Sequence, residues 1–357
     1  MAGQPAGLAL KMSRYLIGKK IRRRRRFPLT MMLEPLEKCN LACQGCGRIR
    51  EYGPLGDKMM TVEECLEAVA ECGAPVVSVT GGEPLMHPDI DRIVDGILQQ
   101  GRFVYLCTNS LLMKAALKKL KPSPHFTFVV HVDGLRETHD RAVQRRRVFD
   151  VAMRAIRMAR EAGFRVCTNT TVYDGASPQE FQELFAMLTK TGVEGIMLSP
   201  GFQYPEAAEQ GIFLARRKAT DFFKAVFERS RNGTRYYHNP LYLDFLQGKR
   251  DYQCSQWTMP TRTPMGWRQP CYLIADAHVA TFAELMETTH WDRYGFGRDP
   301  RCATCLMHCG YEGSALLEAM EKPSAMGTML RRFAMAPPLA LGAMVRRAVL
   351  APLRGRT

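Results

Sequence analysis

The chain has 357 residues, 46% of them hydrophobic, so it can bury one large core or two smaller ones. Twelve cysteines are too few for a small secreted disulfide scaffold, and no signal peptide is recognised before them. The formal net charge of +15 lies at the two ends, because residues 1–26 carry nine basic side chains and residues 323–357 carry six, with no acid in either. Residues 27–322 are neutral, which gives them no general reason to bind nucleic acid.

Both basic ends mix their charges with bulky apolar side chains. This mixture suits the surface of an anionic bilayer, where each Lys or Arg is worth about 1 kcal/mol. The longest apolar stretch, residues 333–345, contains two prolines and is too short to span a membrane. We therefore expect a basic apolar arm over residues 1–26 and a similar tail over residues 323–357, which hold a cytoplasmic protein on the inner face of the membrane. Solvated, disordered tails and contact with RNA are alternative interpretations.

Between about residues 27 and 200, apolar β-branched segments alternate with amphipathic ones. The expected strands are Leu29–Glu34, Val76–Thr80, Phe103–Thr108, Thr127–Val132, Arg165–Val172 and Gly195–Leu198. The expected helices are Val62–Cys72, Ile90–Gln100, Leu112–Leu120, Phe149–Ala162 and Gln179–Thr191, the first opened by a capping box of Thr61 and Glu64. Six strand–helix repeats predict an α/β fold with a parallel sheet and right-handed crossovers. Six repeats are too few for a closed eight-unit barrel, so we expect an open, partial (βα)6 barrel over residues 27–200.

A loop with three cysteines follows the first expected strand. Cys39, Cys43 and Cys46 have C-x3-C-x2-C spacing. Three thiolates from one short loop can hold three irons of a four-iron four-sulfur cluster and leave the fourth iron open. A zinc ion would need a fourth ligand, and none lies close by in sequence. The spacing favours a cluster, at the carboxyl end of a strand where such sheets place their active sites.

Polar residues follow several later strands. The second strand ends in Gly81, Gly82 and Glu83, where glycines allow close approach of the backbone to a ligand and Glu83 adds a carboxylate. The later strand ends carry Thr108, Asn109, His131, Asp133, Asn169 and Thr171. Each of these is also a common cap or turn residue. As a set at one edge of the sheet, they predict the lining of a site.

Residues 201–322 differ in pattern and predict an accessory region packed on the barrel. It begins with a longer helix over Ala215–Arg229 and continues into a segment rich in Pro, Trp and Cys over residues 239–310. Cys302, Cys305 and Cys309 have C-x2-C-x3-C spacing, and Cys271 could supply a fourth thiolate. An auxiliary iron–sulfur cluster, a zinc site and reduced cysteines are all compatible with this pattern.

The cysteine loop followed by the Gly-Gly-Glu turn resembles the radical S-adenosylmethionine superfamily. In that family the open iron is chelated by the amino and carboxylate groups of S-adenosylmethionine, and the glycine turn binds the amino group. The resemblance implies that the cysteine loop holds the cluster, and that an electron donor such as flavodoxin or ferredoxin reduces it to release a 5′-deoxyadenosyl radical. It also implies that Gly81, Gly82 and Glu83 hold the methionyl end of S-adenosylmethionine. Among the strand-end residues, Asn109, Asp133, Asn169 and Thr171 are the further candidates for cofactor binding. Many members have an aromatic residue before the third cysteine, where this chain has Gly45, so the adenine contact must come from elsewhere.

A narrower resemblance is to the hopanoid-biosynthetic members of the superfamily, of the adenosylhopane synthase type. It rests on Leu33–Leu36 with the cysteine loop, and on Gly266–Leu273, Glu284–Thr289 and Cys305–Glu312. It implies that the deoxyadenosyl radical adds to the terminal alkene of diploptene, a pentacyclic triterpene, and leaves a tertiary alkyl radical that must gain a hydrogen atom.

Cys107, at the end of the third expected strand, is the best-placed thiol for this donation, because an S–H bond is weaker than the C–H bond being made. Its alternative interpretation is a small buried core residue. Two other functions stay open for the chain: a radical enzyme that modifies peptides and holds an auxiliary cluster, and a non-catalytic cysteine-rich metal module.

Overall fold

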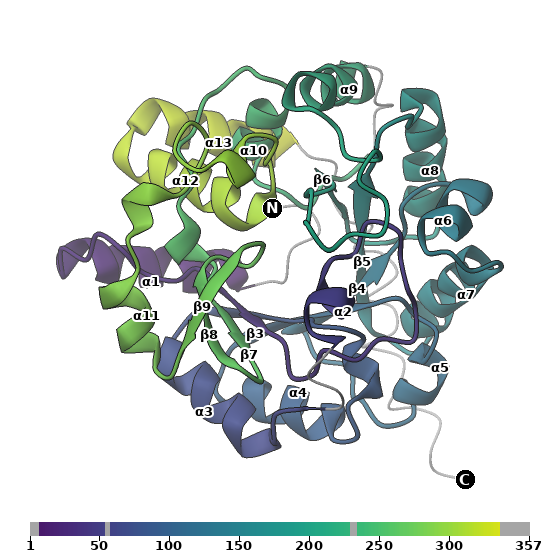
Figure 1. Ribbon diagram of the computed structural model, residues 1–357, viewed down its shortest axis with the longest axis horizontal. Helices are drawn as coiled ribbons and strands as arrows, with labels where there is room; N and C mark the ends of the chain where they lie inside the picture. The colour runs from purple at the N-terminus through teal and green to yellow at the C-terminus, as the bar shows by residue number, and fades with distance from the viewer. Residues whose placement is uncertain (1–6, 54–57, 229–233, 336–357) are drawn as a thin grey trace, which may run out of the picture.

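The computed structural model describes residues 7–53, 58–228 and 234–335 (Figure 1). One sheet contains nine strands in the order β6-β5-β4-β3-β2-β1-β7-β8-β9. Its first six strands along the chain are parallel to one another, as the sequence predicts. They are β1 (Thr30–Leu33), β2 (Val76–Val79), β3 (Phe103–Thr108), β4 (Phe126–His131), β5 (Arg165–Val172) and β6 (Ile196–Pro200). The expected partial α/β barrel is confirmed.

Helices cover the outer face of these strands (Figure 1). They are α3 (Val62–Cys72), α4 (Ile90–Gln99), α5 (Met113–Ala116), α6 (Arg136–Ala142), α7 (Val148–Glu161) and α8 (Pro178–Lys190). The capping box expected at Thr61 and Glu64 opens α3. Strand β3 shows how the two faces differ: Val104 and Leu106 join the large core beneath the helices, whereas Phe103 and Tyr105 join a smaller cluster on the inner face.

Two helices differ from the prediction. Helix α5 ends at Ala116 rather than at Leu120, and the chain continues in turns toward Pro122. A proline disfavours the helical conformation at the residue before it, so a helix is expected to end before this position. Helix α6 was not expected, because its seven residues are too short to show a helical period.

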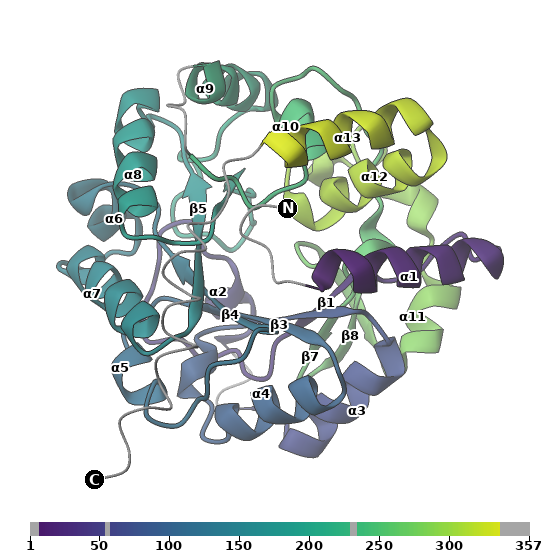
Figure 2. The same cartoon turned by 180° about the vertical axis from the view of Figure 1, so that it is seen from behind.

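The N-terminal segment is a helix rather than a free arm. Residues Leu8–Ile21 form α1, and Leu8 packs with Val76 and Phe103 at the amino ends of the inner strands. Leu16 packs with Phe27 on a second small cluster. Part of the arm expected over residues 1–26 is thus the helix α1, and residues 1–6 lie outside the described residues. In Figure 2, α1 lies toward the viewer, whereas α2 (Arg48–Glu51), which follows the cysteine loop, lies farther away, behind the strands.

The accessory region adds three strands to the barrel sheet. Strand β7 (Thr261–Thr263) pairs parallel with β1, and β8 (Gly266–Pro270) and β9 (Ala275–Val279) follow as antiparallel neighbours. Its helices are α9 (Arg216–Glu228), α10 (Pro240–Leu246), α11 (Phe282–Thr288), α12 (His308–Glu321) and α13 (Pro323–Met335). The short 3-10 helices are η2 (Pro84–Met86), η3 (Gln256–Thr258), η4 (Trp291–Arg293) and η5 (Pro300–Cys302).

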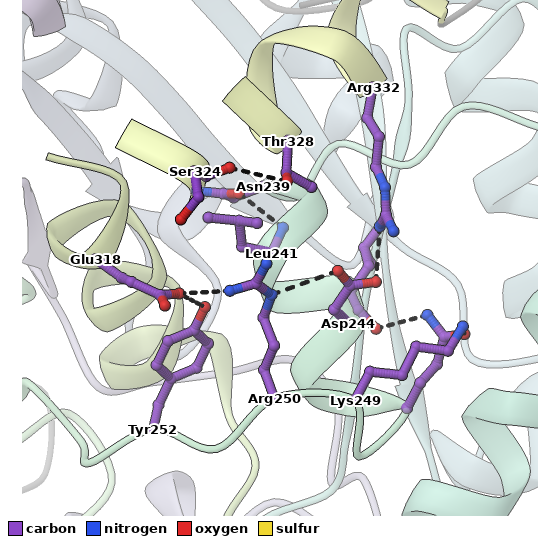
Figure 3. Close-up of polar contacts among 12 residues, drawn as sticks. Asn239, Leu241, Asp244, Lys249, Arg250, Tyr252, Glu318, Ser324, Thr328 and Arg332 are labelled. Atoms are coloured by element: carbon purple, nitrogen blue, oxygen red, sulfur yellow. Dashed lines mark hydrogen bonds and ion pairs between the residues drawn. The ribbon is translucent and has the colours of Figure 1, made fainter. Parts of the chain in front are cut away.

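Ion pairs fix the last described helix to this region (Figure 3). Asp244 on α10 accepts a hydrogen bond from Arg332 on α13 at 2.7 Å and faces Arg250 at 3.5 Å. Arg250 also binds Glu318 on α12 at 2.8 Å. The beginning of the tail expected over residues 323–357 is thus a docked helix, and its part beyond residue 335 lies outside the described residues. Within the described ranges, no helix is both long and apolar enough to cross a bilayer.

Candidate active site

Glu83 is the centre of a polar network at the carboxyl ends of β2 and β3. Its carboxylate accepts hydrogen bonds from the Thr108 hydroxyl at 2.8 Å and from the backbone N–H groups of Asn109 at 2.8 Å and Leu85 at 3.1 Å. The side chain is almost completely buried, and burial raises the pKa of Glu83 to about 7 against the opposing effect of these hydrogen bonds. A carboxylate has about four acceptor positions, so one stays open for a cation.

The two glycines before Glu83 join this turn to the cysteine loop. The backbone N–H of Gly82 donates to the Leu36 carbonyl at 3.0 Å, and that of Glu83 donates to the Lys38 carbonyl at 2.9 Å. A Cβ at Gly81 or Gly82 would overlap these same carbonyls, and Gly81 has a φ of 112°. Glycine is required at both positions, because the chain that enters the cysteine loop lies directly against them.

The cysteine loop presents three half-buried, free thiols: Cys39, Cys43 and Cys46. Arg50 on α2 donates to the Cys46 carbonyl at 2.6 Å, which holds the turn. The Asn109 amide nitrogen lies 3.8 Å from the Cys39 sulfur, so the sheet edge and the loop meet. Within the described ranges, no three Cys, His, Asp or Glu side chains surround one point closely enough for a single ion. In a four-iron cluster each of these three thiolates would bind a different iron, which leaves the fourth iron open.

The later strand ends add a second polar group. His131 and Asp133 form an ion pair at 2.7 Å, and the other Asp133 oxygen accepts the backbone N–H of Thr171 at 2.7 Å. Burial lowers the pKa of His131, but the adjacent Asp133 carboxylate outweighs it and raises that pKa overall. Asn169 lies on β5 opposite His131, and its buried side-chain oxygen has no hydrogen-bond partner within the described chain. The structure thus brings together all the polar residues that the sequence places at this edge.

Two aromatic residues that the sequence analysis missed lie over the glycines of the cysteine loop. A Cβ at Gly45 would overlap the Tyr173 ring, and a Cβ at Gly47 would overlap the Tyr204 side chain. Tyr173 follows β5, and burial, together with the nearby Asp133, raises the pKa of its hydroxyl well above the usual value. The only sequence signal for these two contacts was the pair of glycines, Gly45 and Gly47. A glycine has no side chain, so an aromatic ring from another part of the chain can occupy that space.

Cys107 lies on the inner face of the barrel, near the carboxyl end of β3. It packs against the inner cluster that contains Tyr105 and Cys167, and its sulfur is 3.6 Å from the Ser78 hydroxyl. Burial raises the pKa of Cys107 to about 11, with a small opposing effect of the Ser78 hydrogen bond. Cys107 is therefore a protonated thiol at neutral pH, one residue before Thr108, which binds Glu83.

A buried set of charges lies beneath the cysteine loop. Arg48, at the start of α2, pairs with Glu34 at the end of β1, and both side chains are almost fully buried. The Arg48 guanidinium lies between the rings of Tyr52 and Tyr272, with centroid distances of 5.2 and 5.0 Å. Glu37 is close by, and burial together with the Glu34 charge raises its pKa to about 9, so it is neutral at pH 7.

The predicted accessory cysteines also meet. Cys271, Cys302, Cys305 and Cys309 line one small, largely enclosed cavity, although they come from two separate segments of the chain. All four are free thiols.

Comparison with known proteins agrees with this geometry. Residues 33–188 match the model of the Radical SAM superfamily, and residues 196–329 match a domain of unknown function, DUF3463. The GTP 3',8-cyclase of Aquifex aeolicus is 30% identical over 169 residues, which cover 44% of this chain and 52% of that protein. The AdoMet-dependent heme synthase of Methanosarcina barkeri is 34% identical over 140 residues, 38% of this chain and 40% of that protein. The chain thus spans about half the length of this cyclase and less than half of this heme synthase.

Solved structures show the same fold. Streptococcus suis SuiB superposes with a TM-score of 0.61 at 16% identity over 87% of this chain and 78% of that one. The enzyme anSMEcpe with bound AdoMet superposes with a TM-score of 0.55 at 17% identity over 74% of this chain and 81% of that one. Residues 33–188 therefore form a domain of the radical S-adenosylmethionine superfamily, whose cofactors are a four-iron four-sulfur cluster and S-adenosylmethionine.

Proposed function

We propose that this protein is a radical enzyme of the adenosylhopane synthase type, which joins a 5′-deoxyadenosyl group to the terminal alkene of diploptene. Bound at the site, the reduced cluster and S-adenosylmethionine supply the 5′-deoxyadenosyl radical. Cys39, Cys43 and Cys46 would hold the cluster, and Glu83 would accept a hydrogen bond from the ammonium group of S-adenosylmethionine. This proposal rests on the resemblance of several segments, from residue 33 to residue 312, to the hopanoid-biosynthetic members.

The position of Cys107 on the inner face of the barrel, with its sulfur 3.6 Å from the Ser78 hydroxyl and one residue before the Thr108 that binds Glu83, is the observation that carries the proposal. Addition of the radical to the terminal carbon forms one C–C bond, uses the π bond and leaves a tertiary radical. Cys107 then gives a hydrogen atom to that carbon, which leaves a thiyl radical on its sulfur. One electron and one proton restore the thiol, the electron coming from a donor such as flavodoxin or ferredoxin. A thiolate could not act in this way, so burial that keeps Cys107 protonated supports its role.

The decisive experiment is an anaerobic incubation of the reduced, cluster-loaded protein with S-adenosylmethionine and diploptene. Mass spectrometry should find the adduct, whose mass is that of diploptene plus a 5′-deoxyadenosyl group and one hydrogen. Release of 5′-deoxyadenosine without this adduct would contradict diploptene as the acceptor.

The second candidate is a radical enzyme that modifies peptides. The grouped cysteines of the accessory region favour it, and SuiB, of similar fold, has been solved bound to its precursor peptide SuiA. Deoxyadenosine release that depends on an added peptide, and not on diploptene, would support this candidate instead.

Tyr173 is expected to provide the adenine contact that Gly45 lacks. Its ring occupies the side-chain space above Gly45, and an aromatic contact is worth roughly 0.5–1.5 kcal/mol. Tyr173→Leu should therefore weaken binding of S-adenosylmethionine by roughly two- to tenfold. Equilibrium dialysis on the cluster-loaded protein measures this, with Tyr173→Phe as the control that keeps the ring. Equal affinity of the Leu variant and the native protein would exclude this contact.

Binding of S-adenosylmethionine should depend on pH through Glu83. With a pKa of about 7, Glu83 is mostly neutral at pH 6 and mostly ionised at pH 8. If only the ionised form binds the ammonium group, affinity should rise by about tenfold between these pH values. The Glu83→Gln variant has no carboxylate to titrate here, so any change of its affinity with pH comes from the ligand. The quantity to compare is therefore the ratio of the native affinity to the variant affinity at each pH. A ratio that stays constant from pH 6 to 8 would refute the prediction.

Helix α1 is the proposed contact with the anionic, cytoplasmic face of the membrane. Leu10, Ile17 and Ile21 are 65%, 58% and 76% exposed, on a helix whose charges are all positive. The helix covers the amino ends of the strands, so a triterpene from the bilayer must pass around the barrel to reach Cys107.

Anionic liposomes should carry the intact protein upward in a flotation gradient. Replacing Leu10, Ile17 and Ile21 together by Ser should abolish flotation, because the inserted apolar area is lost. Met265→Ser, which changes an exposed apolar residue far from α1, is the matched control. Failure of the native protein to float would eliminate α1 as a membrane contact.

A further inference from the structure

A run of exposed, positively charged side chains lies where the chain passes from α6 to α7, and we call residues 141–147 the arginine loop. Its charges are Arg141, Arg145, Arg146 and Arg147, and it contains no acidic residue. None of the four forms an ion pair within the part of the chain that the structure describes, whereas Arg136 on α6 pairs with Asp150. Since residues 27–322 are neutral overall, the arginine loop is a local concentration of unpaired positive charge.

The arginine loop packs directly on the cysteine loop. Val143 and Val148, both almost fully buried, form a small apolar cluster with Leu41 of the cysteine loop, and two of the three thiols of that loop pack against this cluster. The backbone N–H of Gln44 donates a hydrogen bond to the Ala142 carbonyl at 3.0 Å. A molecule that binds the arginine loop therefore lies beside the proposed iron–sulfur site.

Backbone contacts hold the arginine loop in a defined conformation. The N–H of Arg145 donates to the Asp140 carbonyl at 3.0 Å, as in the Schellman motif that ends many helices. The Asp140 carboxylate accepts hydrogen bonds from the N–H groups of Arg147 at 2.5 Å and Phe149 at 2.9 Å. Gln144 and Arg147 have φ angles of 54° and 68°, a region that glycine adopts more easily. Other residues stay in this region where the surrounding structure fixes them, often at functional sites.

The composition of the arginine loop favours a protein partner over a lipid surface. A contact that lies on a bilayer combines basic residues with apolar ones that insert, as on α1. Both apolar residues of the arginine loop, Ala142 and Val143, are instead buried. The loop also follows the carboxyl end of β4, whereas α1 covers the amino ends of the strands. Positive charge without exposed apolar area, at fixed positions, is complementary to an acidic protein surface.

The proposed cluster needs a partner protein at this place, because each reductive cleavage of S-adenosylmethionine uses one electron from outside. We propose that the arginine loop is the docking surface of the electron donor, an acidic one-electron carrier protein of the flavodoxin or ferredoxin type. The carrier is oxidised by one electron, and the cluster at the cysteine loop is reduced by one. Electron-transfer encounters bury little surface, so complementary charge largely determines how fast they form. This docking surface goes beyond the proposed function and does not depend on diploptene.

Binding is tested with oxidised flavodoxin and with ferredoxin as probes, by calorimetry on the full, cluster-loaded chain at low ionic strength. Replacing Arg141, Arg145 and Arg146 together by Glu should weaken binding by about tenfold or more, and the native affinity should fall more steeply with salt than that of the variant. Arg147 is left unchanged because of its backbone conformation. The matched control reverses three exposed charges between α5 and the amino end of β4: Lys118, Lys119 and Lys121 to Glu. The control should bind like the native chain.

Electron delivery is tested by anaerobic release of 5′-deoxyadenosine. With reduced flavodoxin, the arginine variant should need about tenfold more donor for its half-maximal rate. Reduced methyl viologen, a small cationic reductant, should drive the native chain and the variant equally, which also shows that the variant is folded and loaded.

Three results would overturn this docking surface. They are equal affinity of the native chain and the arginine variant for both probes, no binding of either probe to the native chain, and loss of flotation on phosphatidylserine vesicles in a variant that still binds the probes. The last result would make the arginine loop a lipid contact. None of these measurements uses diploptene, so failure of the docking surface and failure of the proposed function are distinguishable.

Discussion

Cys107→Ala should still cleave S-adenosylmethionine and release 5′-deoxyadenosine, but its yield of the diploptene adduct should fall to background. Cys107 lies outside the cysteine loop and forms no hydrogen bond with Glu83, so cofactor binding does not require its sulfur. The tertiary radical left by addition has no hydrogen-atom donor once the thiol is gone. Liquid chromatography with mass spectrometry measures deoxyadenosine and adduct in the same reaction.

Three controls make this result specific. Cys107→Ser should fail in the same way, because an O–H bond is too strong to give its hydrogen atom to a carbon radical. Cys167→Ala changes a buried thiol of the same inner cluster and should keep the adduct. In deuterated water the native protein should place one deuterium in the adduct, because the thiol proton exchanges with solvent. An unchanged adduct yield in Cys107→Ala would end the assignment of Cys107 as donor.

The barrel strands could be predicted because the residues in them have a high local preference for β-strands. Runs such as Phe103–Thr108 and Arg165–Val172 are rich in β-branched or aromatic residues, and both strands match the prediction to the residue. The polar residues at the strand ends could be assigned to one site for the same reason, since parallel strands place all their carboxyl ends at one edge.

The parts that escaped prediction depend on contacts distant in sequence. Strand β7 has three residues and is defined by pairing with β1, more than 200 positions earlier, so no local signal marks it. Helix α1 was obscured by its charges, although the spacing of Leu8, Met12 and Leu16 gives it an apolar face.

The site shows the same limit at the level of single residues. Tyr173 reaches Gly45 across more than 120 positions of the chain. A glycine in a crowded loop indicates that some side chain is close, but only the fold identifies which one.

Arg48→Met should destabilise the folded protein by about 3–5 kcal/mol, the usual cost of removing one partner from a buried ion pair. Glu34 would keep a charge in a site where its side chain is not exposed to solvent. The loss should appear as a lower free energy of unfolding in urea. Because Arg48 begins the helix that follows Cys46, cluster retention on dilution should also weaken.

Two further variants separate the effect of the uncompensated charge on stability from the effect of lost side-chain packing. Adding Glu34→Gln to Arg48→Met removes the uncompensated charge and should recover part of the lost stability. Glu37→Gln is the matched control: it should change stability little near pH 4, where Glu37 is protonated, and raise it at pH 7, where the native chain must take up a proton at Glu37 to fold. The native protein should lose stability as pH rises from about 5 toward 9, because the unfolded chain releases the Glu37 proton first. The Glu37→Gln variant should lose less over this range, and an equal loss in both proteins would show that Glu37 is ionised in the fold.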